Sequence, residues 1–90
     1  MPGENNISEN RIKIDEIDKE IIELLNQRAD LSLTIRDIKK ASGVEIYDPA
    51  REEEIMDALC KINGGPLDDK NIRELFSKIL EVMKELPDKK

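Results

Sequence analysis

The sequence predicts an all-α fold of three helices, one long and two shorter, which assembles as an intertwined homodimer. The first observation is a run of good helix formers from about Glu9 to Ser42 that contains no Gly and no Pro. The second is the spacing of its apolar residues, which recur at steps of three and four and not of two. The third is size, because 90 residues with one Phe, one Tyr and no Trp build only a thin core alone, and oligomerisation is the natural remedy.

The long helix carries a continuous apolar stripe. Its members share one side of the helix, and they are Ile14, Ile17, Ile21, Leu24, Leu31, Ile35 and Ile38. Gly43 is placed to end the helix in the left-handed conformation. At about 1.5 Å per residue the helix is roughly 50 Å long, and two shorter helices cover little more than half of the stripe. The remainder predicts a second copy, with the long helices antiparallel about a two-fold axis.

Two shorter helices follow, each with its own start and stop signals. Asp48 and Pro49 form an N-cap acceptor and a favoured first helical residue, and the break at residues 63–66 ends that helix. Asp68 is expected to cap the third helix, and Pro87 closes it. The domain division that follows is a flexible segment over 1–8, one domain over 9–87 and a tail over 88–90.

Composition excludes several classes of function. The net charge is -6 with 40% charged residues and no basic run, which argues against nucleic-acid binding. The chain has no His, and Cys60 is its one Cys, so zinc hydrolase, triad and cysteine-cluster chemistry are not expected, and neither is a metal. With no apolar stretch of roughly 20 residues and a polar start, no membrane segment or signal peptide is predicted, and the expected location is the cytoplasm.

Arg28 occupies a position on the stripe where an apolar residue is expected. A guanidinium there is costly unless an anion meets it. Lys39 returns to nearly the same face about 16 Å further along the helix, and Ser32 and Ile35 lie between them. This spacing describes a site for a small dianion, although pairing with acids of a neighbouring helix or snorkelling to the surface also accounts for it. Arg11 is too far along the helix to share that ligand within one chain, but it reaches the gap across an antiparallel dimer.

The segment over residues 47–52 is the next candidate. Asp48 is sufficiently explained as a helix cap, and Arg51 and Glu52 could form a solvated face of the following helix. Cys60 is interpreted as a core residue, because nothing near it in the sequence would make its thiolate reactive.

Taken together, these residues resemble the all-helical (AroQ-type) chorismate mutases. The likeness covers about residues 9–86 and rests on charged residues in the same order and at matching intervals, namely Arg11, Arg28, Lys39, Asp48, Arg51 and Glu52. The segments 64–67 and 72–76 look most like mutase domains fused to deoxy-arabino-heptulosonate phosphate synthase, so a shikimate-pathway synthase is a possible partner.

The resemblance implies the rearrangement of chorismate to prephenate in phenylalanine and tyrosine biosynthesis, without a cofactor. It implies that Arg28 and the partner subunit's Arg11 bind the substrate carboxylates and that Lys39 contacts the ether oxygen and a carboxylate. It further implies that Arg51, Glu52 and the backbone at Asp48 orient the ring, the last two at its hydroxyl.

One departure from the family pattern weakens this expectation. The family has a Gln or Glu late in the third helix that also contacts the ether oxygen, and Pro87 stands there in this chain, with Met83 four residues earlier where Ser is common. Pro87 keeps open the alternative of a weakly active regulatory module that binds prephenate or a synthase. The same scaffold also resembles the isochorismate pyruvate lyases, which lack the acid at the position of Glu52, so Asp48 and Glu52 favour the mutase.

Overall fold

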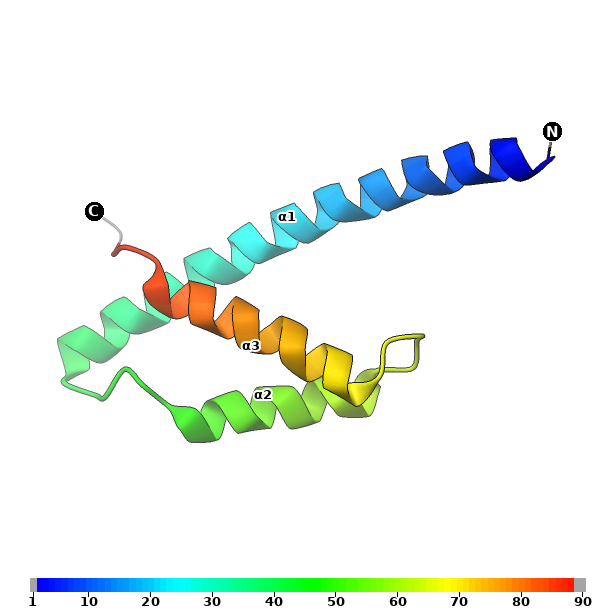
Figure 1. The fold of residues 1–90 in the computed structure, drawn as a ribbon. Helices are drawn as coiled ribbons and strands as arrows, with labels where there is room; N and C mark the ends of the chain where they lie inside the picture. Colours follow the sequence, from blue (N-terminus) through cyan, green and yellow to red (C-terminus); the bar gives the residue numbers. More distant parts are fainter. Residues whose placement is uncertain (1, 89–90) are drawn as a thin grey trace. The chain divides into compact units, whose positions relative to one another are not determined.

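The computed structural model describes the backbone of residues 2–88 and the side chains of residues 6–88. Within this range the chain forms three helices and no strand, namely α1 (Pro2–Ser42), α2 (Pro49–Ile62) and α3 (Asp69–Glu85) (Figure 1). The predicted all-α fold of one long and two shorter helices is confirmed.

The helix ends have the local causes that the sequence indicates. Gly43 has a φ of 70°, and the amides of Val44 and Gly43 donate to the carbonyls of Lys39 and Lys40 at 2.9 and 3.3 Å. This is the Schellman pattern, in which a left-handed residue lets the chain satisfy the last carbonyls of a helix. Helix α1 therefore ends where the glycine predicts.

Both shorter helices begin at an aspartate cap. The Asp48 carboxylate accepts from the Arg51 amide at 3.0 Å. The Asp68 carboxylate accepts from the Asn71 amide at 2.8 Å, and the Asn71 side chain accepts in return from the Asp68 amide at 3.1 Å. A reciprocal capping box of this kind satisfies two backbone donors that the helix leaves open.

The start of α1 differs from the prediction. The helix begins at Pro2 and not near Glu9. Proline suits the first helical position because its fixed φ is helical and its missing N–H has no partner there in any case. Residues 3–8 contain a single large apolar residue, Ile7, and so have no apolar period from which the sequence pattern could extend the helix. Met1 of the predicted flexible segment and residues 89–90 of the predicted tail lie outside the described residues.

The chain divides into two compact units, one up to Leu31 and one from Ser32 onward. The described part of the first unit is helical, and its apolar stripe residues from Ile14 to Leu31 are all exposed. The second unit contains the last residues of α1 together with α2 and α3, and in it α2 and α3 lie side by side (Figure 1).

The core of the second unit is small. Its buried residues are Met56 of α2 and Ile72, Leu80 and Met83 of α3, two helices that contact each other. The three- and four-residue spacing of apolar residues in α3 predicts Leu75 on its core side, but Leu75 is 52% exposed. Two ion pairs also join α2 and α3, because Arg73 pairs with Asp57 at 2.9 Å and with Glu53 at 3.2 Å. These two carboxylates, Asp57 first, raise the pKa of the Arg73 guanidinium.

No helix in the described range is both long and apolar enough to cross a lipid bilayer.

Candidate functional site

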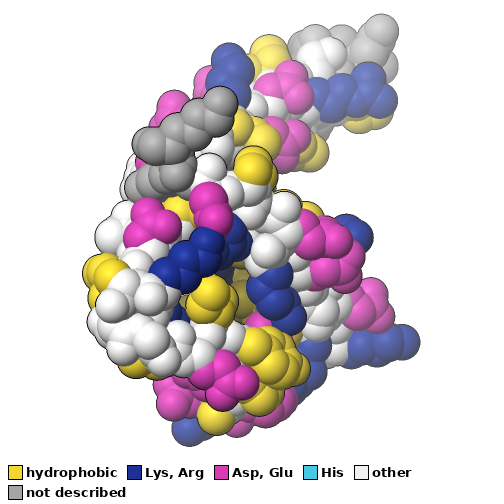
Figure 2. Space-filling model, turned by 90° about the vertical axis from the view of Figure 1, so that its left-hand side faces the viewer, with side chains coloured by type: hydrophobic (Ala, Val, Ile, Leu, Met, Phe, Trp, Pro, Cys, Tyr) yellow, Lys and Arg dark blue, Asp and Glu magenta, His cyan; other side chains and the backbone are white. Residues whose placement is uncertain are grey.

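A pocket of about 270 Å³ opens in the second unit where four segments meet. The end of α1, the loop that follows it, the first turn of α2 and the last turn of α3 contribute its lining residues, which are Arg36, Ile46, Tyr47, Asp48, Glu52 and Lys84. At this end of the molecule, hydrophobic surface is recessed between side chains of Lys and Arg (Figure 2). The pocket therefore combines acids, bases and an aromatic ring around a small volume.

Asp48 and Glu52 are the two predicted site residues that line the pocket. Asp48 lies just before α2, where its carboxylate caps the helix, and its carbonyl accepts from the Glu52 amide at 3.2 Å. The cap fixes the first turn of α2 against the loop, because it ties the N-cap side chain to the N3 amide. Glu52 is consequently held one turn into α2 on the side of the pocket.

Lys84 closes the pocket from α3. Its Nζ lies 3.0 Å from Glu52 Oε2 and 5.1 Å from the centre of the Tyr47 ring. The hydrogen bond to Glu52 is the main cause that raises the pKa of the Lys84 ammonium above its usual value. The pair therefore joins the first turn of α2 to the last turn of α3 through charged groups.

Arg36 forms the wall of the pocket on the α1 side. Its guanidinium donates to the carbonyls of Leu86 at 2.7 Å, Met83 at 2.8 Å and Lys84 at 3.3 Å. Helix C-termini expose such unpaired carbonyls and carry partial negative charge, so a guanidinium is a suitable partner. Arg36 thus fixes the end of α3 on α1.

Asp88 also contacts Arg36. It pairs with Arg36 at 3.1 Å and also with Lys40. The hydrogen bonds from Lys40 and Arg36, in that order, lower the pKa of the Asp88 carboxyl. This residue, which follows the end of α3, is therefore held between two cations of α1.

The other predicted site residues are not among the lining residues of this pocket. Arg51 pairs with Glu54 at 3.1 Å on the exposed side of α2. On α1, Ser32 and Lys39 are half-buried and Ile35 is exposed in the second unit. Arg11 is exposed and Arg28 half-buried in the first unit.

Sequence reasoning missed Arg36, Tyr47 and Lys84 as pocket residues. The sequence around Arg36 gives no sign of its role, because the carbonyls that Arg36 binds belong to residues 47 to 50 positions later. The only sequence hint for Lys84 is a basic residue in the last turn of a helix, which is common because it complements the helix dipole.

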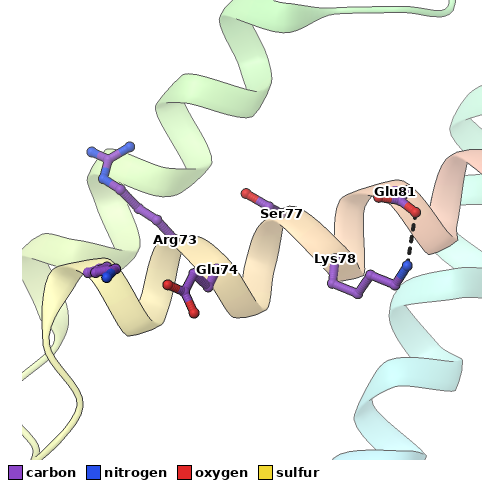
Figure 3. A pocket seen from close by; sticks show the side chains of 6 residues that line it. Arg73, Glu74, Ser77, Lys78 and Glu81 are labelled. Carbon is purple, nitrogen blue, oxygen red and sulfur yellow. Dashed lines mark hydrogen bonds and ion pairs between the residues drawn. The ribbon is translucent and has the colours of Figure 1, made fainter.

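A second depression, of about 780 Å³, runs along α3 alone. Its lining residues are polar and charged, and Lys78 among them pairs with Glu81 at 2.9 Å (Figure 3). These residues come from successive turns of one helix, so among the described residues no second element lines the depression. Among residues 6–88, no group of three or more His, Cys, Asp or Glu side chains is arranged to hold a metal ion.

Comparison with known proteins places this architecture. The chorismate mutase type II family model matches residues 10–87. The chorismate mutase of Methanocaldococcus jannaschii is 37% identical over 81 residues, which cover 89% of this chain and 82% of that protein. A solved chorismate mutase from Thermus thermophilus superposes with a TM-score of 0.88 at 36% identity, over 90% of this chain and 92% of that one.

Longer relatives match as well. The bifunctional chorismate mutase/prephenate dehydratase of Aquifex aeolicus is 35% identical over a 78-residue alignment, which covers 82% of this chain and 22% of that protein. The chain thus spans about a fifth of the length of the bifunctional relatives that it matches. Because the family model covers most of the chain and the M. jannaschii relative is matched over most of its own length, the chain belongs to the chorismate mutase type II family.

Proposed function

We propose that the chain converts chorismate to prephenate. The observation that carries the proposal is the family match over residues 10–87, within which Asp48 and Glu52 line one pocket. In this rearrangement the ether C–O bond breaks and a C–C bond forms within one molecule, so atoms and electrons balance without an added reactant. The step needs neither base nor nucleophile.

The chemistry asks the protein for two things. The substrate must be held in its folded conformer, which converts a rare geometry into the bound one. Negative charge that develops on the ether oxygen must meet a preorganised donor. Lys39 is the proposed donor, and Arg28 together with Arg11 of the partner subunit is proposed to bind the two carboxylates.

Three residues at the start of α2 are proposed to orient the ring. Glu52 and the backbone at Asp48 take the ring hydroxyl, and Arg51 assists them. Support comes from the pocket, where the Glu52 side chain is only 31% exposed. Arg51 would have to leave Glu54, with which it forms an exposed pair; such a pair costs little to break.

At the position where the family has a late Gln or Glu, the third helix of this chain has already ended. Helix α3 ends at Glu85, and Leu86 is its C-cap. Pro87 follows, where a backbone donor is absent and the helix cannot continue. Under the proposal, the ether oxygen therefore relies on Lys39, and a weaker enzyme than its relatives is expected.

The proposed active form is a homodimer. The predicted stripe residues of α1 other than Arg28 are between 45% and 65% exposed in the single chain. Exposed aliphatic side chains in such a continuous series mark a surface that another protein covers. A second copy fits because an antiparallel pairing about a two-fold axis presents the same stripe from the other side. Sedimentation should give about twice the chain mass, and a compact, active monomer would contradict the proposal.

The test of activity is the loss of chorismate absorbance with purified protein, followed by identification of the product. Prephenate supports the proposal. Release of pyruvate instead would indicate the lyase alternative, and binding without turnover would indicate the regulatory alternative; either result overturns the proposed function.

Two further expectations stay predictions. One is the cytoplasmic location. The other is a shikimate-pathway synthase as a partner or fused domain, whereas the longer relative from Aquifex aeolicus is named as a bifunctional chorismate mutase/prephenate dehydratase.

A further inference from the structure

Two cationic side chains, Arg36 and Lys84, line the pocket together with Asp48 and Glu52, and they have different partners. The Arg36 guanidinium is directed to carbonyls at the end of α3 and to Asp88. Lys84 is directed across the pocket to the Glu52 carboxylate, 3.0 Å away. Arg36 therefore holds the end of α3 in place, whereas Lys84 contacts a residue of the proposed site.

The Lys84–Glu52 pair differs from the surface pairs that lie within a single helix. Arg51–Glu54 and Lys78–Glu81 join residues three apart on one helix, with every side chain at least 55% exposed. Lys84 and Glu52 come from different helices, and their side chains are 50% and 31% exposed. Shielding from water strengthens a charge pair, and a pair between two helices fixes a direction that a local pair does not.

The charge of the pocket gives the pair a second consequence. Two acidic residues, Asp48 and Glu52, line the pocket that is proposed to orient the ring of a dianion. Like charges at short range raise the free energy of binding unless a cation offsets them. Lys84 provides this offset at Glu52, and its ammonium lies over the Tyr47 ring, where it is attracted to the face of the aromatic ring.

We propose that Lys84 is a positioning residue that holds the Glu52 carboxylate at the pocket. In this position Glu52 can accept a hydrogen bond from the hydroxyl of an anionic substrate. The inference rests on the proposed function. It deepens that function by assigning a role to a residue of α3 that the sequence analysis left without one.

The test compares three variants in the full-length chain. Lys84→Met removes the charge but keeps an unbranched side chain beside Tyr47. Lys84→Arg keeps a charge that can reach Glu52. Lys78→Met is the matched control, because Lys78 is also on α3 and also pairs with an acid, Glu81, outside this pocket (Figure 3).

The expected result is a split between the kinetic constants. Lys84→Met should raise the KM for chorismate by about tenfold with a smaller change in kcat, because an interaction that serves binding and not the transition state is lost. Lys84→Arg should recover most of the loss, and Lys78→Met should match the unmodified chain. Thermal midpoints of Lys84→Met and Lys78→Met should agree within a few degrees.

A double-mutant cycle ties the effect to Glu52. When Glu52 is already Gln, Lys84→Met should change KM little, because residues that act together are not additive. If the KM effects of the two substitutions simply multiply, the positioning role is wrong.

Failure of the inference and failure of the proposed function are separable. An active unmodified chain whose Lys84→Met variant keeps its KM overturns the inference alone. If the unmodified chain does not turn over chorismate, calorimetry of chorismate binding replaces KM: weakening by Lys84→Met supports the positioning role in a binding site, and unchanged or absent binding overturns it.

Discussion

The guanidinium of Arg36 donates a hydrogen bond of 2.7 Å to the carbonyl oxygen of Leu86, the C-cap residue of α3. Two further bonds reach Met83 and Lys84, so one side chain of α1 satisfies the open end of another helix. The Arg36 side chain is only 13% exposed, and its bonds to Leu86 and Met83 are partly shielded from water. This contact holds the last turn of α3, with Lys84, at the pocket.

We expect Arg36→Ala to destabilise the protein. Hydrogen bonds to a charged group contribute about 2 kcal/mol each at most sites, and several are lost here, although water can replace some of them at the helix end. A loss of about 2 kcal/mol or more in the free energy of unfolding is predicted, measured by denaturant titration at fixed protein concentration.

Arg51→Ala is the control for that measurement. Its pair with Glu54 is exposed on both sides, and such pairs contribute about 0.5 kcal/mol or less. Equal losses for the two arginines would show that the bonds of Arg36 to α3 do not stabilise the fold.

Asp88→Asn should change how stability depends on pH. Lys40 and then Arg36 lower the pKa of the Asp88 carboxyl in the folded chain. The pKa of this carboxyl is about 3.9 in the unfolded chain. Because its pKa is lower in the folded chain, the ionised carboxylate stabilises the fold above about pH 3.9, and this stabilisation is lost as the pH falls through the folded pKa. The variant lacks this contribution at neutral pH and should therefore lose less stability below about pH 4. Thermal midpoints from about pH 2 to 7 check this, and parallel curves for the two proteins would refute it.

Lys39→Ala tests the proposed ether-oxygen donor. With Pro87 unable to donate, removal of Lys39 should lower kcat by at least roughly 100-fold, as the loss of one electrostatic donor does. Circular dichroism and dimer mass should stay unchanged, because the half-buried Lys39 side chain is not expected to carry the fold. A variant with intact turnover would make Lys39 a surface lysine only.

Local signals in the sequence are sufficient for three of the helix ends. Asp48, Asp68 and Gly43 each act through atoms within a few residues, and the structure has all three in the predicted roles. The start of α1 at Pro2 was missed because a mainly polar segment without a period gives no signal of helix length.

Contacts between helices could not be predicted in the same way. Helical spacing alone did not place Leu80 in the core or leave Leu75 exposed, because both lie close to the boundary of the apolar face. Arg36 and Lys84 acquire their roles from residues more than 30 positions away in the sequence. For Glu52 the sequence predicted the site, and the structure adds the lysine that it pairs with.

The central claim is that a site built from two chains rearranges chorismate. If Arg11 serves the partner's site and Arg28 its own, either substitution to Ala inactivates the homodimer. When the two variants are unfolded and refolded together, about half of the dimers are mixed, and each has one site with both arginines and one with neither.

Chorismate turnover in the remixed sample, compared with each variant alone, tests this most directly. Roughly a quarter of all sites should regain full activity if assembly is random. Arginines that only maintain the fold would give no rescue. A remixed sample as inactive as its parents, from an unmodified chain that is active, would contradict the shared site.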